Sequence, residues 1–89
     1  MTKQSIVSIL ESISDSYRSD TNTVTMFHIN DTEKLFAVRI LDRKKQNYFG
    51  TIYCDSIRID DNSELVQFIN DGKIISIFSY LAISEINLL

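Results

Sequence analysis

The chain has 89 residues, of which 44% are hydrophobic and 24% are charged, and its formal net charge is −3. This length leaves room for one domain over residues 1–89 with a thin core, and the apolar fraction is too high for a disordered chain. The acidic balance argues against a protein whose main task is to coat nucleic acid. The first 20 residues lack the continuous apolar run of a secretion signal or a membrane span, so we expect a cytoplasmic protein that contacts no membrane.

The first predicted element is a helix over residues 3–17. Thr2 precedes it as a candidate N-cap, because a threonine hydroxyl can accept from the free N–H groups of a first turn. The turn-forming segment 19–22 then ends the pattern. The apolar side chains recur at the spacing of one helical face, at Ile6, Leu10, Ile13 and Tyr17.

Three runs rich in β-branched and aromatic residues follow, at 23–30, 34–41 and 47–54. We predict an antiparallel meander in which Val38 pairs with Met26 on one side and with Ile52 on the other. This register brings apolar residues together on one face, which the N-terminal helix is expected to cover. The predicted core face carries even-numbered residues, namely Val24, Met26, Phe36, Val38, Ile40, Ile52 and Cys54.

The parity of the apolar residues changes after Cys54, which indicates a β-bulge near residues 55–56 or the start of a separate short strand. Residues 61–72 predict a second short helix. Asp61 suits its N-cap, Glu64 lies three residues on as in a capping box, and Gly72 suits its C-terminal end.

The tail, residues 73–89, fits either a helix or a strand, and we favour a strand over 74–80. The expected fold class is therefore α+β. It consists of an N-terminal helix packed on a three- to four-stranded antiparallel sheet, with a second short helix.

No group of residues predicts catalysis, a cofactor or a metal site. His28 and Cys54 are the only histidine and cysteine, too few for a structural zinc site. The predicted register separates them by about 10 Å on two sides of Phe36. We interpret His28 as a partly exposed rim residue and Cys54 as a small core hydrophobe. Two glycines lying far apart cannot form a phosphate-binding loop, so we expect no enzyme activity and no cofactor.

The best functional lead is the odd-numbered face of the predicted sheet, which also remains partly apolar. Its aromatic-rich composition is typical of protein interfaces. The patch either binds another protein, a second copy in a homodimer included, or is buried by the second helix or the tail. We expect a small protein-binding module, for example an inhibitor, immunity or anti-defence protein of bacterial or phage origin. The candidate partner-binding residues are Phe27, Ile29, Phe49 and Tyr53.

Arg43, Lys44 and Lys45 support a rival hypothesis, because only two residues separate them from the aromatic pair Tyr48 and Phe49. Such a turn can neutralise phosphates and stack bases in a nucleic-acid-binding or transcription-regulatory protein. A solvated hairpin tip explains the same residues without a ligand. We favour that interpretation, because nucleic-acid binders usually carry a basic stripe across a whole face.

Overall fold

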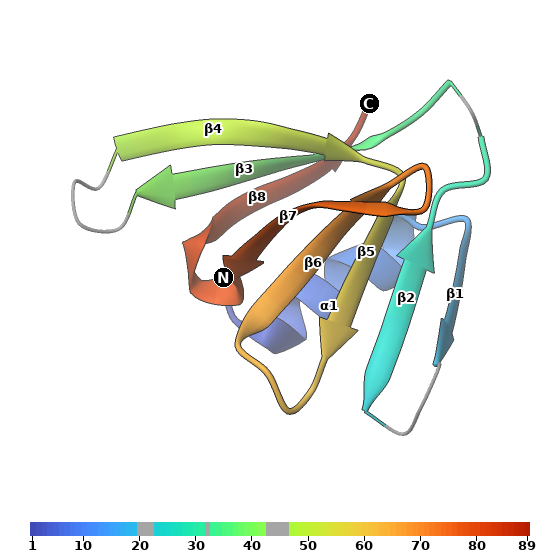
Figure 1. Cartoon of the computed structure of the whole chain (residues 1–89), viewed down its shortest axis with the longest axis horizontal. Helices are drawn as coiled ribbons and strands as arrows, with labels where there is room; N and C mark the ends of the chain where they lie inside the picture. The colour runs from blue at the N-terminus through green and yellow to red at the C-terminus, as the bar shows by residue number, and fades with distance from the viewer. Residues whose placement is uncertain (20–22, 32, 43–46) are drawn as a thin grey trace.

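The computed structural model describes residues 1–19, 23–31, 33–42 and 47–89. Its strands form two antiparallel sheets, of five strands in the order β1-β2-β5-β6-β7 and of three strands in the order β4-β3-β8 (Figure 1). The α+β class is as predicted, but two sheets replace the single expected one. The elements are α1 (Lys3–Ile13), β1 (Ser16–Ser19), β2 (Val24–His28), β3 (Phe36–Asp42), β4 (Asn47–Cys54), β5 (Ser56–Asp60), β6 (Leu65–Asn70), β7 (Lys73–Ser79), the 3₁₀ turn η1 (Tyr80–Ala82) and β8 (Ile83–Leu88).

Helix α1 lies behind the five-stranded sheet in the view of Figure 1 and buries Ile6 and Leu10 completely. The Thr2 hydroxyl accepts from the backbone N–H of Ser5 at 3.1 Å, which confirms the predicted N-cap. The helix ends at Ile13, earlier than predicted, because the chain there becomes extended and enters β1. No helix in the described part of the chain is long and apolar enough to cross a membrane.

The hairpin of β3 and β4 has the predicted register. Val38 pairs with Ile52, and Phe36 pairs with Cys54. A β-bulge then leaves Phe49 without a partner, so Leu41 pairs with Tyr48. On its other side β3 pairs with β8. β8 belongs to the tail, for which the sequence fits either a helix or a strand.

The predicted pairing of Met26 with Val38 is wrong, because β2 belongs to the other sheet. Met26 pairs with Arg58 of β5. The chain passes from one sheet to the other at Asp55, whose carbonyl accepts from the N–H of Ile29 at 2.9 Å. The predicted break at residues 55–56 is therefore confirmed as the start of a separate strand. Because β2 lies in the five-stranded sheet and not beside β3, Phe27 is fully buried while Met26 is only half-buried.

The predicted helix over residues 61–72 is also wrong, because this segment forms β6 and a tight turn into β7. Asp71 and Gly72 have φ angles of 52° and 76°, as a two-residue hairpin turn of type I′ requires. Val66 and Phe68 are buried at every second position, which is the period of a strand. The strand favoured over 74–80 is confirmed as β7, and the second helical element among the described residues is the short turn η1.

The core lies between the two sheets and α1. Its largest fully buried side chains come from both sheets and the helix, and include Phe27, Phe36, Phe68, Ile6, Leu10, Ile40 and Ile57. Burial of these apolar groups supplies the main favourable term for folding. Both sheets thus use one face for this core, and their opposite faces are where a functional surface must be sought.

Candidate protein-interaction surface

The structure does not bring the four candidate partner-binding residues together on one surface. Phe27 and Ile29 are 0% and 9% exposed and belong to the core. Phe49 and Tyr53 both lie on β4 and are 66% and 49% exposed. The exposed pair on β4 is therefore the part of the predicted patch that a partner can reach.

Phe49 owes its position to the β-bulge in β4. Its ring packs edge-to-face against Phe78 of β7, with ring centroids 5.8 Å apart. Phe78 in turn lies 6.5 Å from the buried ring of Phe68. The three rings form a chain from the core to the surface, in which Phe49 is the outermost member. A ring contact of this kind restricts the orientation of an exposed aromatic side chain.

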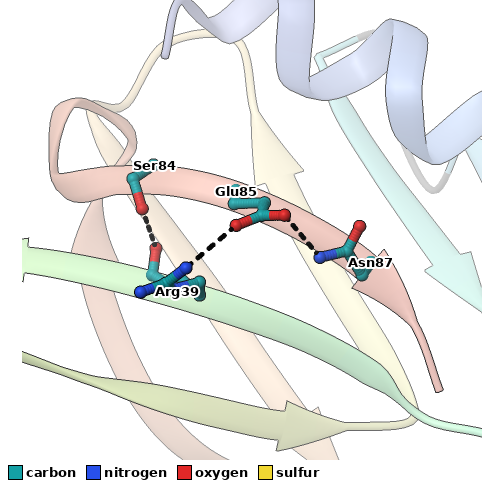
Figure 2. Close-up of polar contacts among 4 residues, drawn as sticks. All are labelled: Arg39, Ser84, Glu85 and Asn87. Carbon is teal, nitrogen blue, oxygen red and sulfur yellow. Dashed lines mark hydrogen bonds and ion pairs between the residues drawn. The ribbon is translucent and has the colours of Figure 1, made fainter. Parts of the chain in front are cut away.

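Tyr53 lies on the outer face of the three-stranded sheet, opposite Ala37 of β3. The same face carries a polar network on β3 and β8, which Figure 2 shows. Arg39 Nη1 donates to Glu85 Oε2 at 3.3 Å, and Asn87 Nδ2 donates to Glu85 Oε1 at 2.8 Å. The Asn87 amide, and secondly Arg39, hold the pKa of the Glu85 carboxyl below its ordinary value. An exposed aromatic side chain beside a polar network matches the core and rim of many interfaces.

A second exposed apolar surface lies on β7 and was missed by sequence reasoning. Ile74, Ile75 and Ile77 are between 47% and 54% exposed. The signal that could have found them is the lack of alternation in residues 73–79, where isoleucines stand at both parities. The tail is one of two elements that could bury the odd-numbered face of the predicted sheet, and residues 73–79 instead form an edge strand of the five-stranded sheet.

Cys54 is fully buried, which confirms its interpretation as a small core hydrophobe. Burial, and secondly the nearby Asp55 carboxylate, raise the pKa of its thiol to about 12, so the nucleophilic thiolate does not form near neutral pH. His28 is half-buried, as expected of a rim residue, and its Nδ1 lies 3.0 Å from the Ser56 hydroxyl on the neighbouring strand. Within the described ranges, no three His, Cys, Asp or Glu side chains are grouped as a metal site requires.

Asp61 and Glu64 do not cap a helix, because they precede β6 and not a helix. The neighbouring carboxylates instead stabilise turns. Asp60 Oδ1 accepts from the N–H of Asn62 at 2.9 Å, and Asp55 Oδ2 accepts from the N–H of Asp71 at 3.0 Å. The Lys3 ammonium donates to the carbonyls of three residues in the same turn, Asp60, Asp61 and Ser63, at 3.1, 3.0 and 2.6 Å. These contacts give the charged groups a structural role.

The basic residues Arg43, Lys44 and Lys45 lie outside the described residues, between the paired Asp42 and Asn47. The hypothesis of a nucleic-acid contact at this turn therefore stays a prediction. No family model matches the sequence, and neither a curated protein nor a solved structure matches it. Function must accordingly be inferred from the surfaces of the chain itself.

Proposed function

We propose that this chain is a small, non-enzymatic protein-binding module whose contact surface is centred on Phe49 and Tyr53. The observation that carries the proposal is the exposure of Phe49. The fold buries Phe27, Phe36 and Phe68 completely, yet it leaves this phenylalanine about two-thirds exposed. Large exposed aromatic side chains are enriched at protein interfaces, where they tend to carry binding energy.

The environment of Phe49 suits it to this role. Full burial of an aromatic side chain stabilises a complex by roughly 1.5–3 kcal/mol. The edge-to-face contact with Phe78 already restricts the ring before binding, so less conformational entropy is lost on association. Tyr53 adds a second aromatic ring with a polar tip on the same strand, β4.

We propose further that the module acts as an inhibitor, as an immunity or anti-defence protein of bacterial or phage origin would. A chain of 89 residues can block another protein by covering part of its surface, which needs a contact face and no catalytic groups. The net charge of −3 favours approach to a basic partner surface.

The proposal is tested with the double variant Phe49→Ser and Tyr53→Ser. The partner is first identified by pull-down from lysate of the native host and mass spectrometry, and binding is then measured by calorimetry. We expect the double variant to bind at least about 2 kcal/mol more weakly, as loss of interface hot spots does. Leu65→Ser is the matched control, because Leu65 is also half-exposed but lies on β6 of the other sheet.

Two outcomes would contradict the proposal. One is a folded double variant that binds its partner with unchanged affinity. The other is an affinity that falls steeply with salt concentration, because phosphate contacts produce that dependence and apolar contacts do not. The second result would favour nucleic-acid binding through residues 43–45.

A further inference from the structure

The turn between β5 and β6, residues 60–63, directs backbone carbonyl groups at the ammonium group of Lys3. The Nζ atom donates to the carbonyl oxygens of Asp60, Asp61 and Ser63 at 3.1, 3.0 and 2.6 Å. A lysine ammonium group has three N–H donors, so the turn provides one acceptor for each. The ring centroid of Tyr80 lies 5.5 Å from the same nitrogen, within the range of a cation–π contact.

The turn keeps its shape through hydrogen bonds that do not involve Lys3. Asp60 Oδ1 accepts from the N–H of Asn62 at 2.9 Å, and the carbonyl of Asp60 also accepts from the N–H of Ser63 at 3.1 Å. Ser63 Oγ accepts from the N–H of Leu65 at 3.0 Å. Because these bonds already orient the carbonyl groups, a bound cation does not have to order them.

The surroundings of the turn also favour a cation. The turn carries the carboxyl groups of Asp60 and Asp61, whose negative charge attracts a cation. Tyr80 is held beside the turn, because its N–H donates to the carbonyl of Glu64 at 2.9 Å. A cavity of about 500 Å³ adjoins the turn and gives a soluble amine room to enter when the lysine side chain is removed. The cavity is lined by Lys3, Gln4, Val7, Ser8, Glu11 and Asp61.

We propose that residues 60–63 and Tyr80 form a binding site for a primary ammonium group, and that Lys3 is its resident ligand. A primary ammonium group matches the site, because it combines a positive charge with one N–H donor for each carbonyl. A guanidinium group is planar and does not fit converging acceptors in this way, and a quaternary ammonium group has no donor. The site fastens the first turn of α1 to the five-stranded sheet. It goes beyond the proposed function, because it does not include Phe49 or Tyr53.

The variant Lys3→Ala empties the proposed site. Alanine favours a helix at least as well as lysine, so the substitution removes the contacts of the side chain without weakening α1 itself. We expect the equilibrium constant for unfolding, measured in urea, to rise at least about tenfold. Lys34→Ala is the matched control without such a rise. Lys34 is exposed, and its ammonium group contacts no acceptor among the described residues.

The missing group is then returned from solution. n-Propylammonium carries the carbon stem and the ammonium group that Lys3→Ala removes. It should restore the stability of Lys3→Ala as its concentration rises, because a ligand that binds only the folded state stabilises that state. It should leave the wild type and Lys34→Ala unchanged. n-Propyltrimethylammonium has the same charge and stem but no N–H donor, so at equal ionic strength it should not restore stability.

Acetylation of the wild type provides a second measurement, which needs no variant. A lysine nitrogen attacks N-hydroxysuccinimidyl acetate through its lone pair and takes the acetyl group, while N-hydroxysuccinimide and a proton leave. The Lys3 ammonium group must first give up its hydrogen bonds, so we expect it to react at least about tenfold more slowly than Lys34 and Lys73. Both of these lysines are exposed. Mass spectrometry of peptides from the partly acetylated protein gives the three rates.

The ammonium site is overturned if Lys3→Ala is as stable as Lys34→Ala, or if n-propylammonium does not stabilise it. Equal restoration by the two salts would also overturn the site, because no N–H donor would then be needed. If Lys3→Ala is unfolded, refolding by n-propylammonium alone is the supporting result. In the wild type, acetylation of Lys3 at the rate of Lys34 would show that its ammonium group is not held. These results do not depend on binding to a target, so they are independent of the proposed function.

Discussion

β3 and β7 are both seven-residue strands dominated by apolar side chains, but they have opposite environments. β3 lies between β4 and β8, and its Phe36 and Val38 are completely buried. β7 lies at a sheet edge, and its isoleucines are about half-exposed. Apolar composition thus favours a strand in both cases, while burial depends on the neighbours that the fold places around it.

The two strands also differ in how their apolar residues alternate. β3 turns Val38 towards the core and the adjacent Arg39 towards solvent, as a strand with one wet face should. β7 has isoleucines at positions 74, 75 and 77, and the irregularity at Ile75 brings Ile74, opposite Ile69, and Ile77, opposite Gln67, onto the outer face of the sheet. Exposed apolar residues on an edge strand are typical of surfaces that contact other molecules.

The largest expected effect comes from placing a charge on each strand. Val38 lies between Ile52 and Ile86 in its sheet, and Val38→Asp would bury an unpaired carboxylate there. Because total stability is about 5–10 kcal/mol, we expect this variant to be unfolded. Ile77→Asp on β7 should remain folded and change the free energy of unfolding of the monomer by at most about 1 kcal/mol.

Urea denaturation followed by circular dichroism measures both variants. A Val38→Asp protein that unfolds cooperatively with the wild-type midpoint would show that β3 is not central to the core. An unfolded Ile77→Asp protein would show that β7 is as deeply integrated as β3, and the contrast between the two strands would disappear.

The next effect concerns the turn that positions β7. Gly72 has a φ angle of 76°, where an L-residue with a side chain is strained, so Gly72→Ala should cost about 1–2 kcal/mol. Gly50 on β4 is the matched control, because an added Cβ there meets no atom within 4 Å and the backbone is ordinary. Equal stability of the two alanine variants in denaturation experiments would show that the turn does not fix β7.

The same turn explains why the sequence did not distinguish a helix from a hairpin over residues 61–72. The dipeptide Asp71-Gly72 suits both a helix C-terminus and a type I′ hairpin, and only its pairing partners decide between them. The register of β3 with β4 could be predicted because a short connection joins two alternating strands. The pairing of β2 with β5 could not, because it depends on the chain turning into a second sheet at Asp55.

The exposed residues of the candidate site could be predicted only on the strand whose pairing partner was predicted correctly. Phe49 and Tyr53 lie on β4, whose partner was assigned correctly, and both are exposed. Phe27 lies on β2, whose partner was predicted to be the wrong strand, and its side chain is in the core. The exposure of a strand residue can be predicted from the sequence only where the neighbouring strands in the sheet are predicted correctly.

A smaller effect should appear at alkaline pH through Cys54, which pairs with Phe36 of β3. Burial raises the pKa of this thiol from 9.0 to about 12. Between these values the unfolded chain has lost a proton that the folded chain retains, so stability falls as pH rises from 9 towards 12. The loss should be about 1 kcal/mol at pH 10. The Cys54→Val variant should lack this part of the pH dependence, and an identical slope in both proteins would show that the thiol is not sequestered beside β3.

The smallest effect is expected at the outer face of β3, where Arg39 and Glu85 are 50% and 48% exposed and satisfy each other within one chain. Exposed ion pairs contribute little, so Glu85→Gln should leave stability at neutral pH almost unchanged. The Asn87 amide and then Arg39 lower the pKa of Glu85. Its contribution is therefore present above about pH 4 and is lost as the pH falls through the lowered value.

Acid denaturation of the wild type and Glu85→Gln, with and without added salt, measures this contribution. The wild type should lose slightly more stability than the variant on acidification, and salt should reduce the difference. If the two acid curves coincide in low salt, the polar network does not stabilise the outer face of β3. A measurable difference would mean that β3 completes its outer face with groups of its own chain. The exposed isoleucines of β7 cannot be satisfied by hydrogen bonds or ion pairs in this way, because apolar side chains gain stability by contact with other apolar surface.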